Sequence, residues 1–163
     1  IVKHSYLIMS AFLLKGEQNM AFDSAKRVIS GTWGEVWLDG DKVAEAYGLQ
    51  LKVSYNKEDV KMCGQMAVDS KVTSVKMTGS LKMHKVNSRM ALKIGSEIRN
   101  GKDLRFTIIS KLDDPDAYGA ERIAAKNVSM DDLTLADWEA GVNGTIEAPF
   151  TFTDYNFLDT VNA

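Results

Sequence analysis

The stretch "VTSVKMTGSLKMHKV", residues 72–86, decides the fold that this chain is expected to adopt. Its odd positions carry the apolar side chains Val75, Met77, Leu81 and Met83. Its even positions carry the polar side chains Lys76, Thr78, Ser80, Lys82 and His84. This period of two predicts a half-buried strand. Fully extended, it would span about 50 Å, whereas a compact domain of this length is only about 38 Å across, so the strand outruns its own domain.

A second alternating stretch precedes it. In residues 49–55 one side carries Leu49, Leu51, Val53 and Tyr55, and the other carries Gln50, Lys52 and Ser54. The polar segment between the two stretches, "NKEDVKMCGQMAVDS" at 56–70, contains Gly64 and predicts a loop with ragged strand ends. Residues 49–86 therefore predict an extended antiparallel hairpin with a long connection.

The rest of the chain predicts more strands and one helix. Residues 33–38 form a strand that ends at the Asp39-Gly40 turn, and 103–112 form another. Shorter strands or extended segments are expected at 122–130 and 131–138, and a closing strand is expected within 143–157. The fold class predicted is mainly β, a β-sandwich or barrel with one flanking helix.

The helix is predicted over residues 88–100. Asn87 or Ser88 can cap its start, and Gly101 suits the position just past its end. Its apolar positions recur at helical spacing and predict a face that packs on a sheet. These positions are Met90, Ala91, Ile94 and Ile98.

Composition sets the broad class. The chain has 163 residues, 45% hydrophobic and 26% charged, which is typical of one globular domain with a core. Cys63 is the single cysteine, which excludes an intramolecular disulfide and a cysteine-based zinc site. No apolar run is long enough to span a bilayer, so we expect no membrane anchor.

Charge is divided unevenly along the chain. Residues 42–112 hold 14 Lys and Arg against 6 Asp and Glu, while residues 113–163 hold 2 against 11. Two solvated faces would explain this division, and so would head-to-tail self-association of a basic half with an acidic half. No basic run interleaves with aromatic residues, which argues against a nucleic-acid-binding protein.

The first nineteen residues, "IVKHSYLIMSAFLLKGEQN", differ from the rest. Lys15-Gly16-Glu17 is not a small-residue cleavage site, which argues against a signal peptide. The codons for these three residues can contain a ribosome-binding sequence a few codons before Met20. We therefore expect residues 1–19 to be a non-native or translated leader and 20–163 to be one domain, the alternative being a genuine N-terminal extension.

Catalytic chemistry is missing from the sequence. Only His4 and His84 could serve as a histidine base, and there is no histidine pair for zinc and no phosphate-binding glycine loop. Asp113, Asp114 and Asp116 lack the glycine and the distal glutamate of a calcium loop, and they predict a solvated turn instead. Cys63 is expected to be a buried or bystander thiol. We therefore expect no enzyme, no catalytic residue, no metal and no cofactor.

Residues from Ile29 to Phe157 resemble the tail tube proteins of contractile-tailed phages of Gram-positive hosts and of phage tail-like bacteriocins. The likeness rests on "ISGTWGEVWLDGD", "NKEDVKMCGQM", "TGSLKMHKVNS", "FTIISKLDDPDAYGAERI" and "EAPFTFTDYNF", in the family's order. The resemblance implies a structural protein whose homohexameric rings stack into the inner tube of a contractile tail. It also implies that each long hairpin joins one continuous barrel between subunits. About 24 lining strands would give a barrel about 50 Å across, wide enough for a DNA duplex.

The resemblance also implies roles for individual residues. The side chains on one face of the hairpin would pack on the core: Leu51, Val53, Val75, Met77, Leu81 and Met83. The other would line the lumen: Gln50, Lys52, Ser54, Lys76, Thr78, Ser80 and Lys82. The loop 56–70 would contact the next ring through Asn56, Lys57, Glu58, Asp59, Met62, Gly64 and Met66.

Partners and location follow from the same resemblance. The partners would be the chain itself, a tail sheath protein, which helix 88–100 and the acidic C-terminal segment would meet on the outside, and baseplate and terminator proteins. The location would be a virion or phage tail-like particle, made in the bacterial cytoplasm and released. DNA would be only a non-specific cargo.

Lysines on a lumen face would bind phosphates and slow DNA. Lys52, Lys76 and Lys82 therefore imply a register shifted by one, pairing with acidic neighbours, or a DNA-free bacteriocin tube. Two other protein classes stay open, a small-ligand-binding β-barrel and the tube protein of a bacterial secretion system.

Overall fold

A computed structural model describes residues 24–161 of the chain. The predicted leader, residues 1–19, lies outside these residues. Two short 3-10 helices, Ala25–Arg27 and Gly31–Trp33, lead into strand β1 (Gly34–Leu38). A tight turn at Asp39 and Gly40, both with positive φ, returns the chain into β2 (Asp41–Lys42). The turn predicted at Asp39-Gly40 is therefore confirmed.

The two longest strands follow, and they form the predicted long hairpin. β3 (Ala46–Val60) pairs antiparallel with β4 (Asp69–His84) over almost their whole length. Residues 56–60 and 69–70, expected to belong to a loop, continue the two strands instead. The connection is therefore shorter than predicted, and the hairpin is longer.

Helix α1 (Arg89–Arg99) follows β4 and is confirmed as the predicted helix. The Oδ1 of Asn87 accepts a hydrogen bond from the backbone N–H of Arg89 at 3.0 Å, and Gly101 takes φ 71° just past the helix end. Ile94 is buried in the core, and Met90 packs against the core. Ile98 is 56% exposed, so its predicted core contact is wrong. It lies in the last turn of the helix.

Four more strands complete the sheet: β5 (Phe106–Leu112), β6 (Glu121–Met130), β7 (Thr145–Phe152) and β8 (Asp154–Asp159). Residues 131–138 form no strand, so of the two alternatives expected there, a short strand or an extended segment, the strand is wrong. Leu133 packs against the core while Leu135 is 70% exposed, so this stretch gives only one apolar contact to the core.

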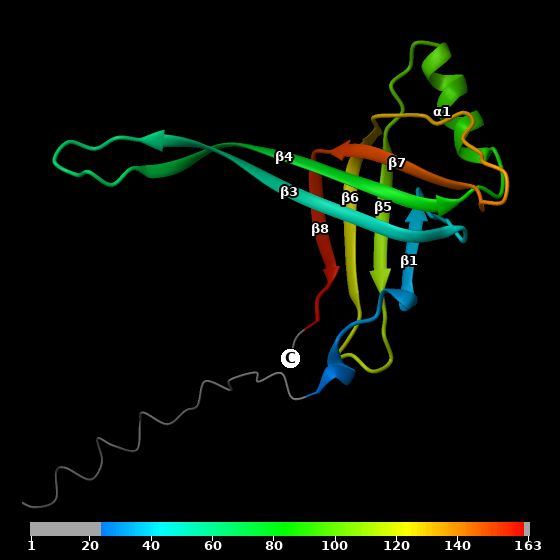
Figure 1. The fold of residues 1–163 in the computed structure, drawn as a ribbon, viewed down its shortest axis with the longest axis horizontal. Coiled ribbons are helices and arrows are strands. Elements are labelled where there is room, and N and C mark those ends of the chain that lie inside the picture. Colours follow the sequence, from blue (N-terminus) through cyan, green and yellow to red (C-terminus); the bar gives the residue numbers. More distant parts are fainter. Residues whose placement is uncertain (1–23, 162–163) are drawn as a thin grey trace, which may run out of the picture.

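All strands belong to one antiparallel sheet with the order β2-β1-β5-β6-β7-β4-β3, and β8 pairs with β6 beside this path. β6 pairs with β5 and β8 along its first part and with β7 only at Ser129 and Met130. Asn127, with φ 55°, lies at this change of partner. The sheet folds over there, so β3, β4 and β7 cross the other strands (Figure 1).

The core lies between the two folded halves of the sheet. Leu81 and Phe150 enter it from one half, and Ile108 and Val128 enter it from the other. These four side chains are fully buried. The mainly β fold with a flanking helix is thus confirmed. Within residues 24–161, however, the sheet does not close into a barrel, because β2 and β3 end its path unpaired with each other.

Candidate assembly surface

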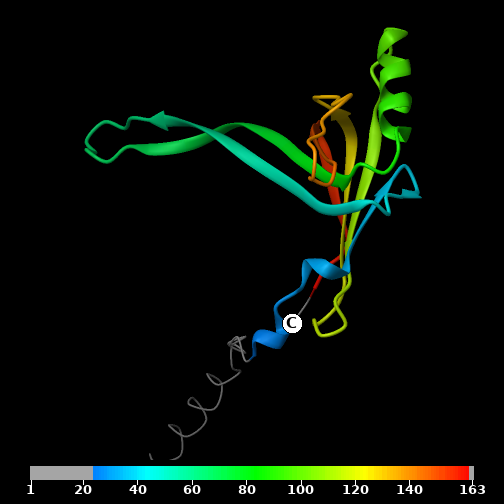
Figure 2. The same cartoon turned by 45° about the vertical axis from the view of Figure 1, so that its right-hand side comes forward.

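The far part of the long hairpin leaves the body of the protein. β7 pairs with β4 only from Met77 to His84, so beyond Met77 the two strands pair with each other alone. We call residues 54–76 the distal ribbon. It projects from the body as a twisted two-stranded arm (Figures 1 and 2).

The distal ribbon exposes large apolar side chains. Tyr55 is 58% exposed and Val75 is 47% exposed, and the two are cross-strand partners. Further exposed members are Val60, Met62, Met66, Val68 and Val72. A lone two-stranded hairpin is marginally stable in water, and clustered exposed apolar side chains indicate an interaction surface. Val75 was expected to pack on the core, and that expectation is wrong because the core ends before the ribbon begins.

The seven residues predicted to line a lumen share one face of the sheet. The register pairs Gln50 with Ser80, Lys52 with Thr78, and Ser54 with Lys76. Cross-strand partners lie on the same face. The opposite face carries Leu81, Met83, Phe150 and Phe152, which are buried in the core. We call the outer set, Gln50, Lys52, Ser54, Lys76, Thr78, Ser80 and Lys82, the polar face.

β7 adds residues to this face that were not predicted there. Glu147 lies opposite Lys82, and Thr151 lies opposite Thr78. The alternation of Thr145, Glu147 and Thr151 with apolar residues indicated that these three side chains share one face of a strand. The pairing of β7 with β4, which places them beside the polar face, could not be read from the sequence.

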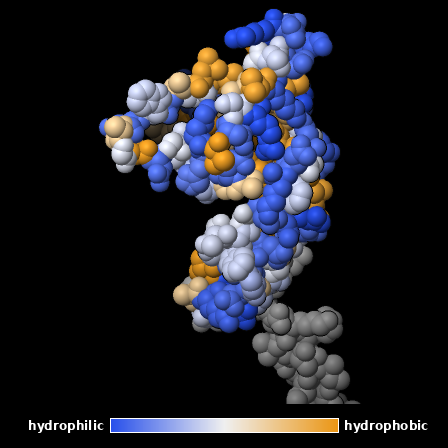
Figure 3. Space-filling view, turned by 90° about the vertical axis from the view of Figure 1, so that its right-hand side faces the viewer, coloured by the Kyte–Doolittle hydropathy of each residue, from blue (hydrophilic) through white to orange (hydrophobic). Residues whose placement is uncertain are grey.

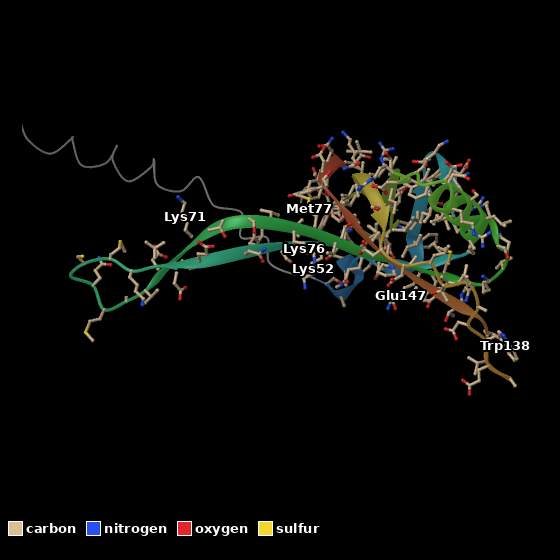
Figure 4. All side chains as sticks on the ribbon, turned by 90° about the horizontal axis from the view of Figure 1, so that it is seen from above. Lys52, Lys71, Lys76, Met77, Trp138 and Glu147 are labelled. Atoms are coloured by element: carbon tan, nitrogen blue, oxygen red, sulfur yellow. The ribbon has the colours of Figure 1, made fainter. Side chains whose placement is uncertain are left out.

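Charge on the polar face is only partly balanced. The Nζ of Lys82 lies 3.8 Å from an Oε1 of Glu147. Lys52 and Lys76 make no ion pair with any residue of 24–161. In Figure 4 both lysines lie on the same side of the ribbon as Glu147, and Met77 lies on the other side. Lys52, Lys76 and Lys82 therefore share one face of the subunit, and the charges of Lys52 and Lys76 remain unpaired within residues 24–161.

The residues predicted to contact a neighbouring ring lie at the far end of the ribbon. Asn56, Lys57, Glu58 and Asp59 belong to β3, and the Nδ2 of Asn56 donates to the Oγ of Ser74 at 2.9 Å. Met62, Gly64 and Met66 belong to the connection, where Gly64 turns the chain with φ 82°. Met66 is fully exposed. Cys63 is also exposed, so its thiol is not buried.

Perturbed carboxylates occur away from the ribbon and support the fold. The backbone N–H groups of Asp116 and Ser30 donate to the carboxylate of Asp114 and hold its pKa below the ordinary value. A hydrogen bond from Lys42 lowers the pKa of Glu35. Both carboxylates hold turns or strands together. The turn predicted around Asp113, Asp114 and Asp116 is confirmed, although Asp114 is buried rather than solvated.

Residues 24–161 contain no group of three His, Cys, Asp or Glu side chains placed to hold a metal ion. In that same range, no helix has both the length and the apolar character needed to cross a bilayer. A hollow of about 470 Å³ lies between β1, the start of β3 and β5, and its lining includes Glu35, Tyr47 and Lys111.

A folded antiparallel sheet with a flanking helix and an outstretched hairpin is a fold shared with chains from contractile injection systems. The fold matches, at TM-score 0.62 and 12% identity, a chain of the PVC sheath–tube complex of an extracellular contractile injection system, covering 81% of this chain and 92% of that one. It matches a chain of the PVC sheath/tube terminator structure at TM-score 0.64 and 12% identity, covering 83% and 100%.

The sequence gives the family. Residues 21–159 match the family model described as phage tail tube protein. The phage-like element PBSX protein XkdM of Bacillus subtilis (strain 168) is 31% identical over 134 residues, 81% of this chain and 91% of that protein. The uncharacterized protein YqbM of the same strain is equally similar. The chain belongs to the phage tail tube protein family, and its role is structural.

Proposed function

We propose that copies of this chain close into rings that stack into the inner tube of a contractile tail or injection particle. The distal ribbon carries the proposal. Its two edges have no ladder partner within residues 24–161, and unpaired strand edges are stable when other strands cover them. Identical neighbours in a ring would supply those strands and would close the sheet that one subunit leaves open.

The ring would contain six copies, in keeping with the 6-fold symmetry of the anti-feeding prophage baseplate, one of the structures similar in fold. In such a ring the polar face lines the lumen, because the opposite face is already occupied by the core. The ribbon residues Asn56, Lys57, Glu58, Asp59, Met62, Gly64 and Met66 contact the next ring. In this proposal the protein is a structural subunit of the tube wall and has no enzymatic role.

The partners proposed beyond the chain itself are a tail sheath protein, a baseplate protein and a terminator protein. The PVC structures similar in fold are a sheath–tube complex and a sheath/tube terminator, which supports these classes of partner. Helix α1 and the acidic C-terminal segment would face the sheath. The protein would reside in a virion or phage tail-like particle that is assembled in the bacterial cytoplasm and released.

Cargo is a second proposal. Lys52 and Lys76 stay uncompensated on the polar face, and a lumen with such charges retards DNA because lysines bind phosphates. This favours a tube that carries no DNA, as in a phage tail-like bacteriocin. Particles that contain nuclease-protected DNA would contradict this cargo assignment and would leave the tube itself intact.

Negative-stain electron microscopy of the purified full chain tests the tube. Rings or tubes with a central channel are expected as concentration rises. A protein that stays monomeric at all concentrations, alone and when mixed with tail fragments from its own particle, would contradict the proposal.

A further inference from the structure

Most of the charged groups that make no ion pair within residues 24–161 lie on the long hairpin or on one loop at the other end of the molecule. Ten ion pairs join side chains of residues 24–161. Five of the cations outside these pairs lie on the long hairpin: Lys52, Lys57, Lys61, Lys71 and Lys76. The hairpin also carries Glu58, Asp59 and Asp69, and it keeps a net positive charge.

The unpaired acids have their own cluster. The connection between β6 and β7, residues 131–144, carries Asp131, Asp132, Asp137 and Glu139 and contains no Lys or Arg. None of these four acids makes an ion pair with a residue of 24–161, although Asp131 accepts a hydrogen bond from the hydroxyl of Thr151 at 3.2 Å. We call residues 131–144 the acidic loop.

The acidic loop also exposes its largest apolar side chains. Trp138 is 84% exposed and Leu135 is 70% exposed, whereas Leu133 packs against the core. Figure 3 faces this end of the molecule and shows apolar surface set among polar surface. A solvent-exposed tryptophan is a large apolar surface, and tryptophan is enriched among the residues that dominate protein interfaces.

The distal ribbon presents a surface that matches this loop. Tyr55 pairs with Val75, and Lys57 pairs with Val72, so these four exposed side chains lie on one face of the ribbon. That face continues the core side of the sheet beyond the point where the core ends. It offers an aromatic ring, two valines and a cation. Tryptophan packs well on such a mixture, because its ring is apolar and attracts cations.

The two surfaces cannot meet within one subunit. The acidic loop lies at one end of the longest axis and the ribbon extends to the other (Figure 1). In Figure 4, Trp138 lies at the end opposite the arm, and Lys71 lies partway along the arm. Complementary surfaces at opposite ends of one chain make head-to-tail contacts between copies.

From these observations, and on the basis of the proposed tube, we infer that the acidic loop of one copy docks on the apolar face of the distal ribbon of the next. Trp138 packs against Tyr55 and Val75, and Asp137 and Glu139 lie beside Lys57 and Lys61. Strand pairing between copies uses the edges of the ribbon, so this contact occupies a surface that pairing leaves free. The partner is a second copy of this chain.

A charge-exchange experiment tests the contact, with assembly followed by sedimentation and negative-stain microscopy. The loop variant Asp137→Lys/Glu139→Lys and the ribbon variant Lys57→Glu/Lys61→Glu should each raise the concentration needed for assembly at least about tenfold. Combining all four substitutions should restore most of the loss. Trp138→Ala should weaken assembly similarly, and Trp33→Ala, which truncates a tryptophan that is 51% exposed elsewhere, should not. Assembly of the loop variants at the wild-type concentration, or no restoration in the combined variant, would overturn the inference.

Cross-linking separates this inference from the proposed tube and does not depend on the stability of the charge variants. In a Cys63→Ser background, Trp138→Cys together with Val75→Cys should form a ladder of disulfide-linked oligomers under mild oxidation, and neither substitution alone should form one beyond a dimer. If tubes form but this ladder does not, the docking of the loop is wrong and the proposed tube is unaffected. If the wild-type chain never assembles, the proposed tube itself is contradicted.

Discussion

Gly79 lies directly beneath the ring of Phe150, so close that a Cβ added to the glycine would meet the Cζ of Phe150 and the backbone oxygen of Gln50, each at 2.5 Å. Gly79 and Phe150 are cross-strand partners in β4 and β7. The missing side chain leaves room for the fully buried ring of Phe150 close to the point where the long hairpin leaves the body. The contact of Phe150 with Gly79 therefore holds β4 against β7 where the hairpin leaves the body.

Gly79→Ala should destabilise the subunit by about 1–3 kcal/mol, because a well-packed ring and a backbone oxygen leave the new methyl group no room. Gly48→Ala is the matched control. A Cβ there meets the Cβ of Lys82 at 3.5 Å, an ordinary contact. Urea unfolding of both variants measures the difference, and an equal stability of the two would show that Phe150 is not held against Gly79.

Ile94→Ala should destabilise the protein by about 2–5 kcal/mol, because the removed atoms leave a cavity between α1 and the core. Ile94 is 4% exposed. Leu92→Ala, on the same helix but 71% exposed, should change the unfolding free energy by less than about 0.5 kcal/mol. If the two variants lost equal stability, the packing of the helix face described above would be wrong.

The stability of the subunit should depend on the ionisation of Asp114. Hydrogen bonds from the backbone N–H groups of Asp116 and Ser30 lower the pKa of its carboxyl below 3.8 in the folded state. The resulting stabilisation is present above the unfolded pKa and is lost as the pH falls through the folded one. Asp114→Asn should therefore lower the melting temperature at pH 7. The difference in melting temperature between this variant and the wild type should become smaller as the pH falls toward 2.

The exposed carboxylate of Asp41 provides the control for this pH dependence. Asp41→Asn should leave the melting temperature at pH 7 almost unchanged, because Asp41 makes no ion pair with a residue of 24–161. A gap between Asp114→Asn and wild type that stays constant from pH 7 to pH 2 would contradict the role given to the carboxylate.

The polar face should become shielded on assembly. In a Cys63→Ser background, Thr78→Cys should react with both a small and a bulky maleimide in the free subunit. In tubes the same cysteine should react only with the small reagent, provided that the bulky maleimide carries a polymer too wide to enter a lumen of DNA-duplex width. Ser96→Cys, on an exposed position of α1, should react with both reagents in either state unless a sheath is present. Equal labelling of Thr78→Cys by both reagents in tubes would place the polar face elsewhere.

How far the sequence could predict this structure depends on whether each element has one buried face. β4 from Met77 onward and β7 alternate because one of their faces meets the core, and this alternation predicted both strands. Residues 56–60 and 69–70 have both faces exposed, so their side chains carry no such period and predicted a loop. Backbone pairing alone extends the strands there, and backbone pairing leaves no trace in the sequence pattern.

The candidate surface was partly predictable for the same reason. The seven residues of the polar face share a parity and could be grouped from the sequence. The pairing of Lys82 with Glu147 depends on the position of β7 beside β4, which joins residues far apart in the chain. The exposed Trp138 had no signal of its own, because an apolar residue in a short segment predicts burial as readily as exposure.

Hydrogen exchange of the backbone amides in the distal ribbon tests most directly the claim that identical neighbours complete this subunit. Residues 54–60 and 69–76 should exchange fast in the free subunit, where only two strands pair, and β5 and β6 should exchange slowly. In assembled tubes the ribbon amides should become as protected as those of β5 and β6. Ribbon amides that exchange equally fast before and after assembly would contradict the account.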